Sequence, residues 1–144
     1  MPVFVDTNVL VYARDLSEPT KQSLAHALIE DLWRSGAGRL SMQVLEEYYV
    51  TMTKKLHPGL PPEDARADVT DFLAWRPVPI DGSLVRIAWD LEDRFSLSFW
   101  DALVVGAAGV ADCPFLLTED LQDGASYDGI VIVDPFRAAV GSLA

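Results

Sequence analysis

Short apolar runs alternate along the chain with longer segments in which apolar residues recur every three or four positions. The short runs are β-prone and predict strands, whereas the three-to-four spacing predicts helices. The predicted strands lie at 3–5, 39–42, 78–80, 115–117 and 130–133. Pro79 restricts the third of these to a short or edge strand, because proline donates no hydrogen bond to a sheet.

Capping residues mark where the helices between these runs begin. Helices are predicted after Asp6, Ser17, Ser41, Pro61, Asp81 and Ser98. Leu24, Leu28 and Leu32 form the expected inward face of the second helix, and Ile87 is expected to point inward in the fifth. No repeat, low-complexity tract or break in composition divides the chain, so residues 1–144 are expected to form one domain. Because strands alternate with helices, the predicted fold class is α/β with a parallel sheet.

The composition is that of a globular protein with a large excess of acidic residues. The 144 residues include 11 Lys and Arg against 22 Asp and Glu, a net charge of −11. This charge argues against a protein that grips nucleic acid through a broad basic surface, but not against an enzyme that reaches phosphates through bound cations. The single cysteine, Cys113, the lack of a signal-like N-terminus and the lack of an apolar run of about 18 residues predict a cytoplasmic protein without a membrane segment.

Four acidic residues occupy positions from which their side chains can converge. Asp6 directly follows the first predicted strand, and Asp120 comes shortly after the fourth. In an open parallel sheet the carboxyl ends of the strands meet at one edge, where ligands bind. Asp101 lies in the first turn of the last predicted helix, and Glu47 lies in the helix after Ser41.

Each of these acids, taken alone, also has an ordinary structural explanation. Asp6 is placed to cap a helix, and Asp101 is placed to compensate a helix dipole. Glu47 is also explained as a solvated helix residue. Asp120 lies near Glu119 and Asp123, either of which could take the same role. The structural explanation is weakest for Asp101, because a charged side chain within the apolar segment Phe-Trp-Asp-Ala-Leu-Val is costly unless it has a partner.

Four blocks of the sequence resemble the PIN-domain ribonucleases, in the order in which that family has them. The blocks are Val-Phe-Val-Asp-Thr-Asn-Val-Leu at 3–10, Ser-Met-Gln-Val-Leu-Glu-Glu-Tyr-Tyr-Val at 41–50, Phe-Trp-Asp-Ala-Leu-Val-Val-Gly-Ala-Ala at 99–108 and Leu-Leu-Thr-Glu-Asp-Leu at 116–121. They span nearly the whole chain. The short length is similar to that of the VapC-type toxins of bacterial toxin–antitoxin pairs.

The resemblance implies a PIN-like three-layer α/β/α sandwich with a short, mostly parallel central sheet. It implies that Asp6, Glu47, Asp101 and Asp120 form an acidic, catalytic pocket that holds Mg²⁺ or Mn²⁺. The supporting residues that it implies are Thr7, Asn8, Thr118 and Glu119, of which Glu119 competes with Asp120 for the fourth acidic position. It further implies a homodimer that binds a cognate antitoxin protein and that acts as an endoribonuclease on tRNA, rRNA or mRNA.

The chemistry of four carboxylates agrees with that expectation. Carboxylates held close together repel one another, which demands a cation or raises their pKa values. Oxygen ligands suit Mg²⁺ or Mn²⁺, and the only histidines, His26 and His57, are expected on the surface or in helix packing. Arg14, Lys54 and Lys55 are candidates for steering the RNA backbone, although each is also explained as a solvated helix charge.

Two other classes of function also fit part of the sequence. A metal-dependent phosphatase or receiver-like phosphotransfer domain also places an Asp after its first strand. That phosphatase motif needs a second Asp where this chain has Asn8, and a receiver needs a late Lys, whereas no lysine follows Lys55. A non-catalytic acidic binding module would have no need of all four acids. The tryptophans are expected in the core or an interface rather than as platforms for bases: Trp33, Trp75, Trp89 and Trp100.

Overall fold

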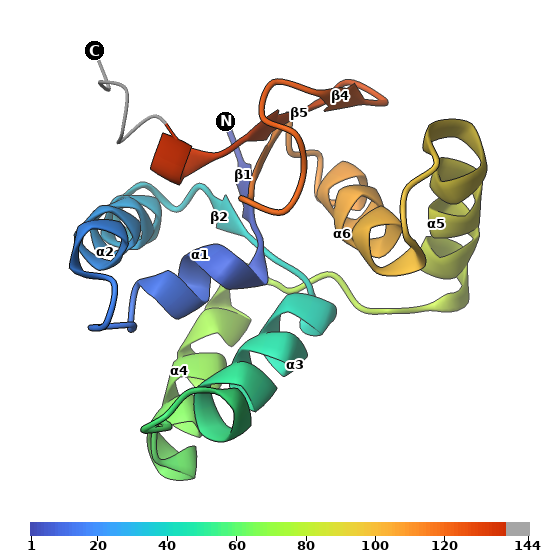
Figure 1. The fold of residues 1–144 in the computed structure, drawn as a ribbon. Helices are drawn as coiled ribbons and strands as arrows, with labels where there is room; N and C mark the ends of the chain where they lie inside the picture. The colour runs from blue at the N-terminus through green and yellow to red at the C-terminus, as the bar shows by residue number, and fades with distance from the viewer. Residues whose placement is uncertain (138–144) are drawn as a thin grey trace.

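The protein forms a three-layer α/β/α sandwich, as expected (Figure 1). The computed structural model describes residues 1–137, so the last part of the predicted 1–144 domain, 138–144, lies outside the described residues. The elements are β1 (Val3–Val5), α1 (Thr7–Tyr12), α2 (Pro19–Ser35), β2 (Gly38–Arg39), α3 (Met42–Val50), a π-helical turn (Thr51–Lys55), α4 (Pro62–Phe72), a 3₁₀ turn (Leu73–Trp75), α5 (Gly82–Phe95), α6 (Phe99–Val110), β3 (Phe115–Leu117), β4 (Ser126–Tyr127) and β5 (Ile130–Val133).

The central sheet is parallel except at one edge. Its strand order is β2-β1-β3-β5-β4, and only the β4–β5 pair is antiparallel. Val5 pairs with Leu117, and Leu117 pairs with Val133, so β1, β3 and β5 all end at the same level. The residues that follow these strands therefore leave the sheet side by side at one edge.

The helices cover the sheet in groups that come from different parts of the chain. Figure 1 shows α5 and α6 packed together on one side, with α6 also in contact with β3 and β5. α1 packs against α2 and α3, and α4 packs against α3. No helix within residues 1–137 has the length and apolar character needed to cross a membrane.

The strand predictions are confirmed at 3–5, 115–117 and 130–133 and need correction elsewhere. The predicted strand at 39–42 is shortened to β2, because Ser41 caps α3 and Met42 already belongs to that helix. The predicted strand at 78–80 is reduced to one bridge, between Val78 and Ser41. β4 was not predicted. Asp128 and Gly129, both with positive φ, join it to β5, a signal for a tight hairpin turn that the sequence did contain.

The helices begin near the predicted caps, and two of the predicted inward faces are confirmed only in part. In α2 the buried residues are Ala25, Ile29 and Leu32, whereas Leu24 and Leu28 are only partly buried. A stripe that repeats strictly every four residues drifts away from the 3.6-residue helical period, which explains the error. Ile87 in α5 is 38% exposed rather than buried.

The tryptophans divide between core and surface. Trp75 is buried, and its ring lies so close to Gly38 that a Cβ there would fall 2.5 Å from it. Trp33 packs against Trp75 at a ring-centroid distance of 5.1 Å. Trp89 and Trp100 lie outside the core, with 54% and 62% of their surface exposed, so of the predicted core or interface positions only the interface is left for them.

Candidate active site

Asp6 lies at the carboxyl end of β1 and is buried beneath the candidate site. Its Oδ1 accepts a hydrogen bond from the Thr7 backbone N–H at 2.7 Å, so Asp6 does cap α1. Its Oδ2 accepts a hydrogen bond from the Thr118 hydroxyl at 2.9 Å. The strand register explains the second contact, because Val5 and Leu117 are paired and the next residue of each strand is Asp6 or Thr118.

Asn8 and Thr118 connect Asp120 to Asp6. The Asn8 Nδ2 donates hydrogen bonds to the Thr118 Oγ1 at 3.0 Å and to the Asp120 Oδ2 at 3.1 Å. The Thr118 Oγ1 also accepts the Asp120 backbone N–H at 3.1 Å. One amide and one hydroxyl therefore orient the two carboxylates that follow β1 and β3.

Glu47 reaches the same group from α3. Its Oε2 accepts a hydrogen bond from the Thr7 hydroxyl at 3.1 Å, and its Oε1 accepts one from the Gln43 Nε2 at 3.1 Å. Thr7 thus contacts Asp6 through its backbone and Glu47 through its side chain. This contact joins residues that lie 40 positions apart in the sequence.

Asp101 completes the group from the first turn of α6. The Ser98 Oγ accepts the Asp101 backbone N–H at 3.1 Å, which fixes this turn as predicted. The negative charge of Asp101 is close enough to raise the pKa of Asp120. The Gln43 Nε2 also donates to the Trp100 carbonyl at 3.3 Å, so the start of α6 is tied to α3.

The electrostatics show that these carboxylates repel one another. Burial raises the pKa of Asp6 to about 6, against the lowering effect of its hydrogen bonds from Thr7 and Thr118. The charges of Asp120 and Glu47 raise it further. The pKa of Asp120 is likewise raised, first by burial and then by its acidic neighbours, against the lowering effect of the hydrogen bond from Asn8. Excess negative charge of this kind favours a bound cation.

Glu119 lines the same cleft as Glu47 and Asp120, but its carboxylate has a different set of partners. Its carboxylate accepts a hydrogen bond from the Tyr12 hydroxyl at 2.8 Å and pairs with the Lys21 Nζ at 3.1 Å. Within residues 1–137, by contrast, none of Asp6, Glu47, Asp101 and Asp120 forms an ion pair. Asp120 rather than Glu119 is therefore the free anion at this position.

A cleft of about 610 Å³ lies beside the acids. Of the three basic residues predicted to steer RNA, only Lys55 lines it. Glu47, Asp120 and Lys55 are among the residues that line it, with Lys55 at the end of the π-helical turn after α3. Lys54 is exposed and is not one of the lining residues.

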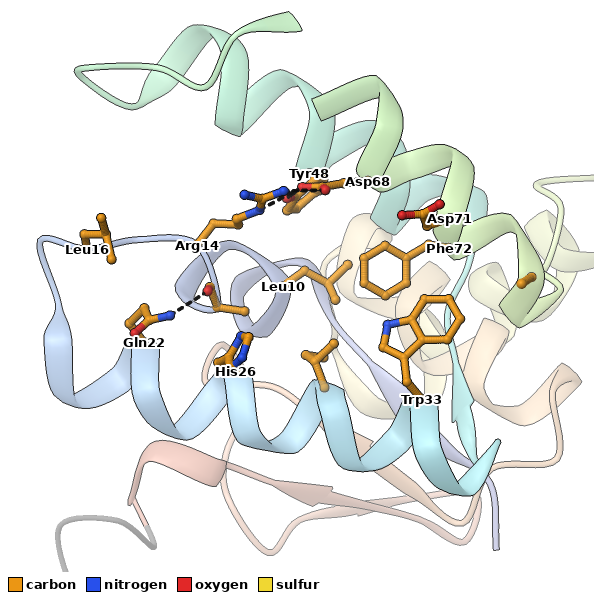
Figure 2. A pocket seen from close by; sticks show the side chains of 13 residues that line it. Leu10, Arg14, Leu16, Gln22, His26, Trp33, Tyr48, Asp68, Asp71 and Phe72 are labelled. Carbon is orange, nitrogen blue, oxygen red and sulfur yellow. Dashed lines mark hydrogen bonds and ion pairs between the residues drawn. The ribbon is translucent and has the colours of Figure 1, made fainter. Parts of the chain in front are cut away.

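Arg14 is not brought to the cleft. Its guanidinium binds both carboxylate oxygens of Asp68, at 2.6 and 3.0 Å, and Asp68 also accepts the Tyr48 hydroxyl at 2.5 Å. Figure 2 shows this cluster at a different cavity, of about 790 Å³, which is bordered by α1, α2 and α4. Arg14 thus forms an ion pair that joins α4 to the end of α1, and its predicted role in steering RNA stays a prediction.

The oxygen atoms that the candidate site offers are of the kind that Mg²⁺ and Mn²⁺ prefer as ligands. They are carboxylate oxygens supported by hydroxyl and amide groups, and these hard oxygen ligands match hard divalent cations. Within residues 1–137, no three Asp, Glu, His or Cys side chains lie close enough together to hold a metal ion as they stand. Glu47 and Asp120 instead receive hydrogen bonds from Thr7, Gln43 and Asn8, which are neutral donors.

The histidines and the cysteine take no part in the site. His26 is exposed and pairs with Glu30 at 3.2 Å, and His57 is exposed, which confirms the prediction for both. Cys113 is buried, and burial raises the pKa of its thiol to about 11, so it is unreactive at neutral pH.

Three residues at the site were missed in the sequence. Gln43 precedes Glu47 by four residues, the spacing at which side chains on a helix meet, so a signal for this contact was present. Tyr12 and Lys21, which hold Glu119, had no local signal, because their contacts join segments about 100 positions apart.

The raised pKa of Asp6 predicts a pH-dependent stability. An ionised Asp6 costs the folded state about 3 kcal/mol, because its pKa is about 6 when folded and about 3.8 when unfolded. The free energy of unfolding should therefore lose this amount as the pH rises through both pKa values, from below about 4 to about 7. Asp6→Asn removes the ionisation, so its stability relative to the unmodified chain should rise by up to about 3 kcal/mol between pH 4 and pH 7.

The measurement is urea unfolding of both proteins across this pH range in the presence of EDTA. Added Mg²⁺ should shrink the difference at pH 7 and leave it unchanged at pH 4, where Asp6 is protonated. A difference between the two proteins that stays constant with pH would show that Asp6 does not ionise in a buried setting.

The chain matches the family described as PIN domain over residues 3–122. No curated protein sequence matches it. Among solved structures it is similar to a toxin–antitoxin complex from Klebsiella pneumoniae, with 19% identity, a TM-score of 0.65 and coverage of 94% of this chain and 98% of that one.

Two further solved structures are also similar to the chain. VapBC2 from Rickettsia felis, bound to a DNA fragment from its promoter, has 15% identity, a TM-score of 0.60 and coverage of 92% and 97%. VapC20 from Mycobacterium tuberculosis, described as a Sarcin-Ricin loop cleaving toxin, has 20% identity, a TM-score of 0.57 and coverage of 79% and 86%.

Proposed function

The chain belongs to the PIN domain family, and from this premise we propose that it is a metal-dependent endoribonuclease and the toxin of a toxin–antitoxin pair. The observation that carries the proposal is the set of hydrogen bonds through which Thr7, Asn8 and Thr118 hold Asp6, Glu47 and Asp120 at one edge of the sheet. The similar structures support it, since they include toxin–antitoxin complexes and a toxin that cleaves the Sarcin-Ricin loop.

In this proposal the four acids hold Mg²⁺ or Mn²⁺ and the neutral side chains orient them. When bound, a divalent cation polarises a phosphate oxygen and lowers the pKa of water, so that water attacks the phosphodiester bond. Asp6 and Asp120 supply carboxylates that Asn8 and Thr118 keep in place. Lys55, at the cleft wall, attracts the RNA backbone toward an otherwise acidic surface.

The proposed partners are an antitoxin protein, a second copy of the chain and an RNA substrate. The net charge of −11 favours basic segments on the antitoxin, because complementary charge speeds and orients association. In the same proposal residues 1–144 act as one PIN-like domain.

The test is incubation of the purified protein with total RNA and with a circular single-stranded RNA. We expect cleavage of both with Mg²⁺ or Mn²⁺, no cleavage in EDTA, and recovery when the cation is restored. Opening of the circle identifies an endonuclease. Cleavage that persists in EDTA, or no cleavage with either cation, would overturn the proposal, and hydrolysis of p-nitrophenyl phosphate without RNA cleavage would favour a phosphatase.

A further inference from the structure

Trp100 is exposed at the start of α6, a helix whose middle is buried. Every residue from 102 to 108 of α6 is buried, whereas 62% of the Trp100 surface faces solvent. An exposed indole forgoes the burial that makes tryptophan stabilising, so packing of the chain does not account for this residue.

The backbone of Trp100 also lies next to the candidate active site. It directly precedes Asp101, and its carbonyl accepts a hydrogen bond from the Gln43 Nε2 at 3.3 Å. The same amide nitrogen donates to Glu47 at 3.1 Å. The backbone of Trp100 is therefore tied, through one side chain, to the acid on α3 and to the acid that follows it on α6.

The hydrogen bond from Gln43 positions the backbone of Trp100. Gln43 is only 5% exposed, and both partners of its Nε2 are acceptors, so the orientation of the amide is determined. The Phe99 and Trp100 rings pack in a T-shaped arrangement, with their centroids 5.3 Å apart and an interplanar angle of 72°. Exposed aromatic rings on which bases stack are one of the features of sites for single-stranded nucleic acid.

We propose that Trp100 stacks on an unpaired base of single-stranded RNA beside the bond that is cleaved. This inference rests on the proposed ribonuclease function. A protein with a net charge of −11 gains little from the phosphate backbone, whereas stacking on a base contributes affinity that does not depend on charge. An indole stacks on any base, and a base within a duplex is already stacked, so the substrate class is an unpaired segment rather than double-stranded RNA.

The experiment measures cleavage of a short single-stranded RNA in Mg²⁺ by Trp100→Ala, Trp100→Phe and the control Trp89→Ala. Trp89 is a comparably exposed tryptophan on α5, with 54% exposure. Trp100→Ala should raise KM roughly 5- to 150-fold with little change in kcat, Trp100→Phe should restore most of the loss, and Trp89→Ala should match the unmodified chain. Unchanged melting temperatures would show that all three variants are folded.

A second arm identifies the stacked base. A series of RNAs, each with one abasic position near the cleavage site, should contain one member that raises KM for the unmodified chain as much as Trp100→Ala does. The same abasic RNA should cause no further loss in Trp100→Ala, because both changes remove the same contact.

The outcomes separate this inference from the function on which it rests. If the unmodified chain does not cleave RNA with either cation, the ribonuclease function fails and the stacking fails with it. If the unmodified chain cleaves but Trp100→Ala keeps its KM, or no abasic position couples to it, only the stacking is overturned. A change in molecular mass in solution on Trp100→Ala, with KM unchanged, would assign Trp100 to contact between copies of the chain.

Discussion

Replacing Asp101 by Asn is expected to reduce RNA cleavage by at least ~100-fold while the protein remains folded. Changes to groups that only support a metal site typically cost about 10- to 100-fold, so loss of a carboxylate that is itself a proposed ligand should cost more. The substitution keeps the volume of the side chain, and the Ser98 cap binds the backbone of residue 101, so the helix start is preserved. It also relieves repulsion with Asp120.

The expected signature is therefore a loss of activity without a loss of stability. The melting temperature of Asp101→Asn should equal or exceed that of the unmodified chain in EDTA, whereas its increase with Mg²⁺ should be smaller. The control is Glu46→Gln, an exposed neighbour of Glu47 on α3, which should cleave RNA at a near-normal rate. Full cleavage by Asp101→Asn with an unchanged Mg²⁺ shift would remove Asp101 from the metal site.

Removing the charge of Asp120 is expected to reduce RNA cleavage far more than removing the charge of its neighbour Glu119. Asp120→Asn should lose at least ~100-fold in cleavage, because Asp120 joins Asp6 through Asn8 and Thr118 and carries no compensating cation. Glu119→Gln should lose less than about tenfold, because its carboxylate is already engaged by Tyr12 and Lys21.

Cleavage rates of the two variants, measured side by side with Mg²⁺, test this assignment. The pair is a matched control, since both changes remove one negative charge from the same loop. Equal losses would mean that the general charge of the loop matters rather than one ligand. A larger loss in Glu119→Gln would exchange the roles of the two residues and require the loop to rearrange when a cation binds.

Much of the local structure was predictable because it depends on residues a few positions apart. The strand at 3–5 followed by Asp6, and the cap at Ser98 that sets Asp101 in the first turn of α6, are signals of this kind. The alternation of strands and helices also predicted the parallel sheet. The inward face of α2 differs in part from the prediction, because a spacing of four residues drifts from the helical period. Strand β4 was not predicted, although the Asp-Gly turn before β5 is typical of a hairpin.

The sequence by itself determined which acidic residues follow strands and helix starts, and so which could share an edge of the sheet. Only the tertiary structure decided how they are connected. The pairing of Val5 with Leu117 places Asp6 against Thr118, a contact across 112 positions that depends on strand register. Loop geometry after β3 sends Asp120 toward Asn8 and its neighbour Glu119 toward Lys21.

The same distinction explains Arg14 and Trp100. Their sequence neighbours predicted a cation near the acids and a tryptophan in the core or an interface. The packing of α4 gives Arg14 the partner Asp68, and the start of α6 leaves Trp100 exposed. Neither outcome is encoded within one helical turn. Each depends on which surfaces of separate elements meet, because the free energy of pairing a charge or burying a ring is gained only when distant segments come into contact.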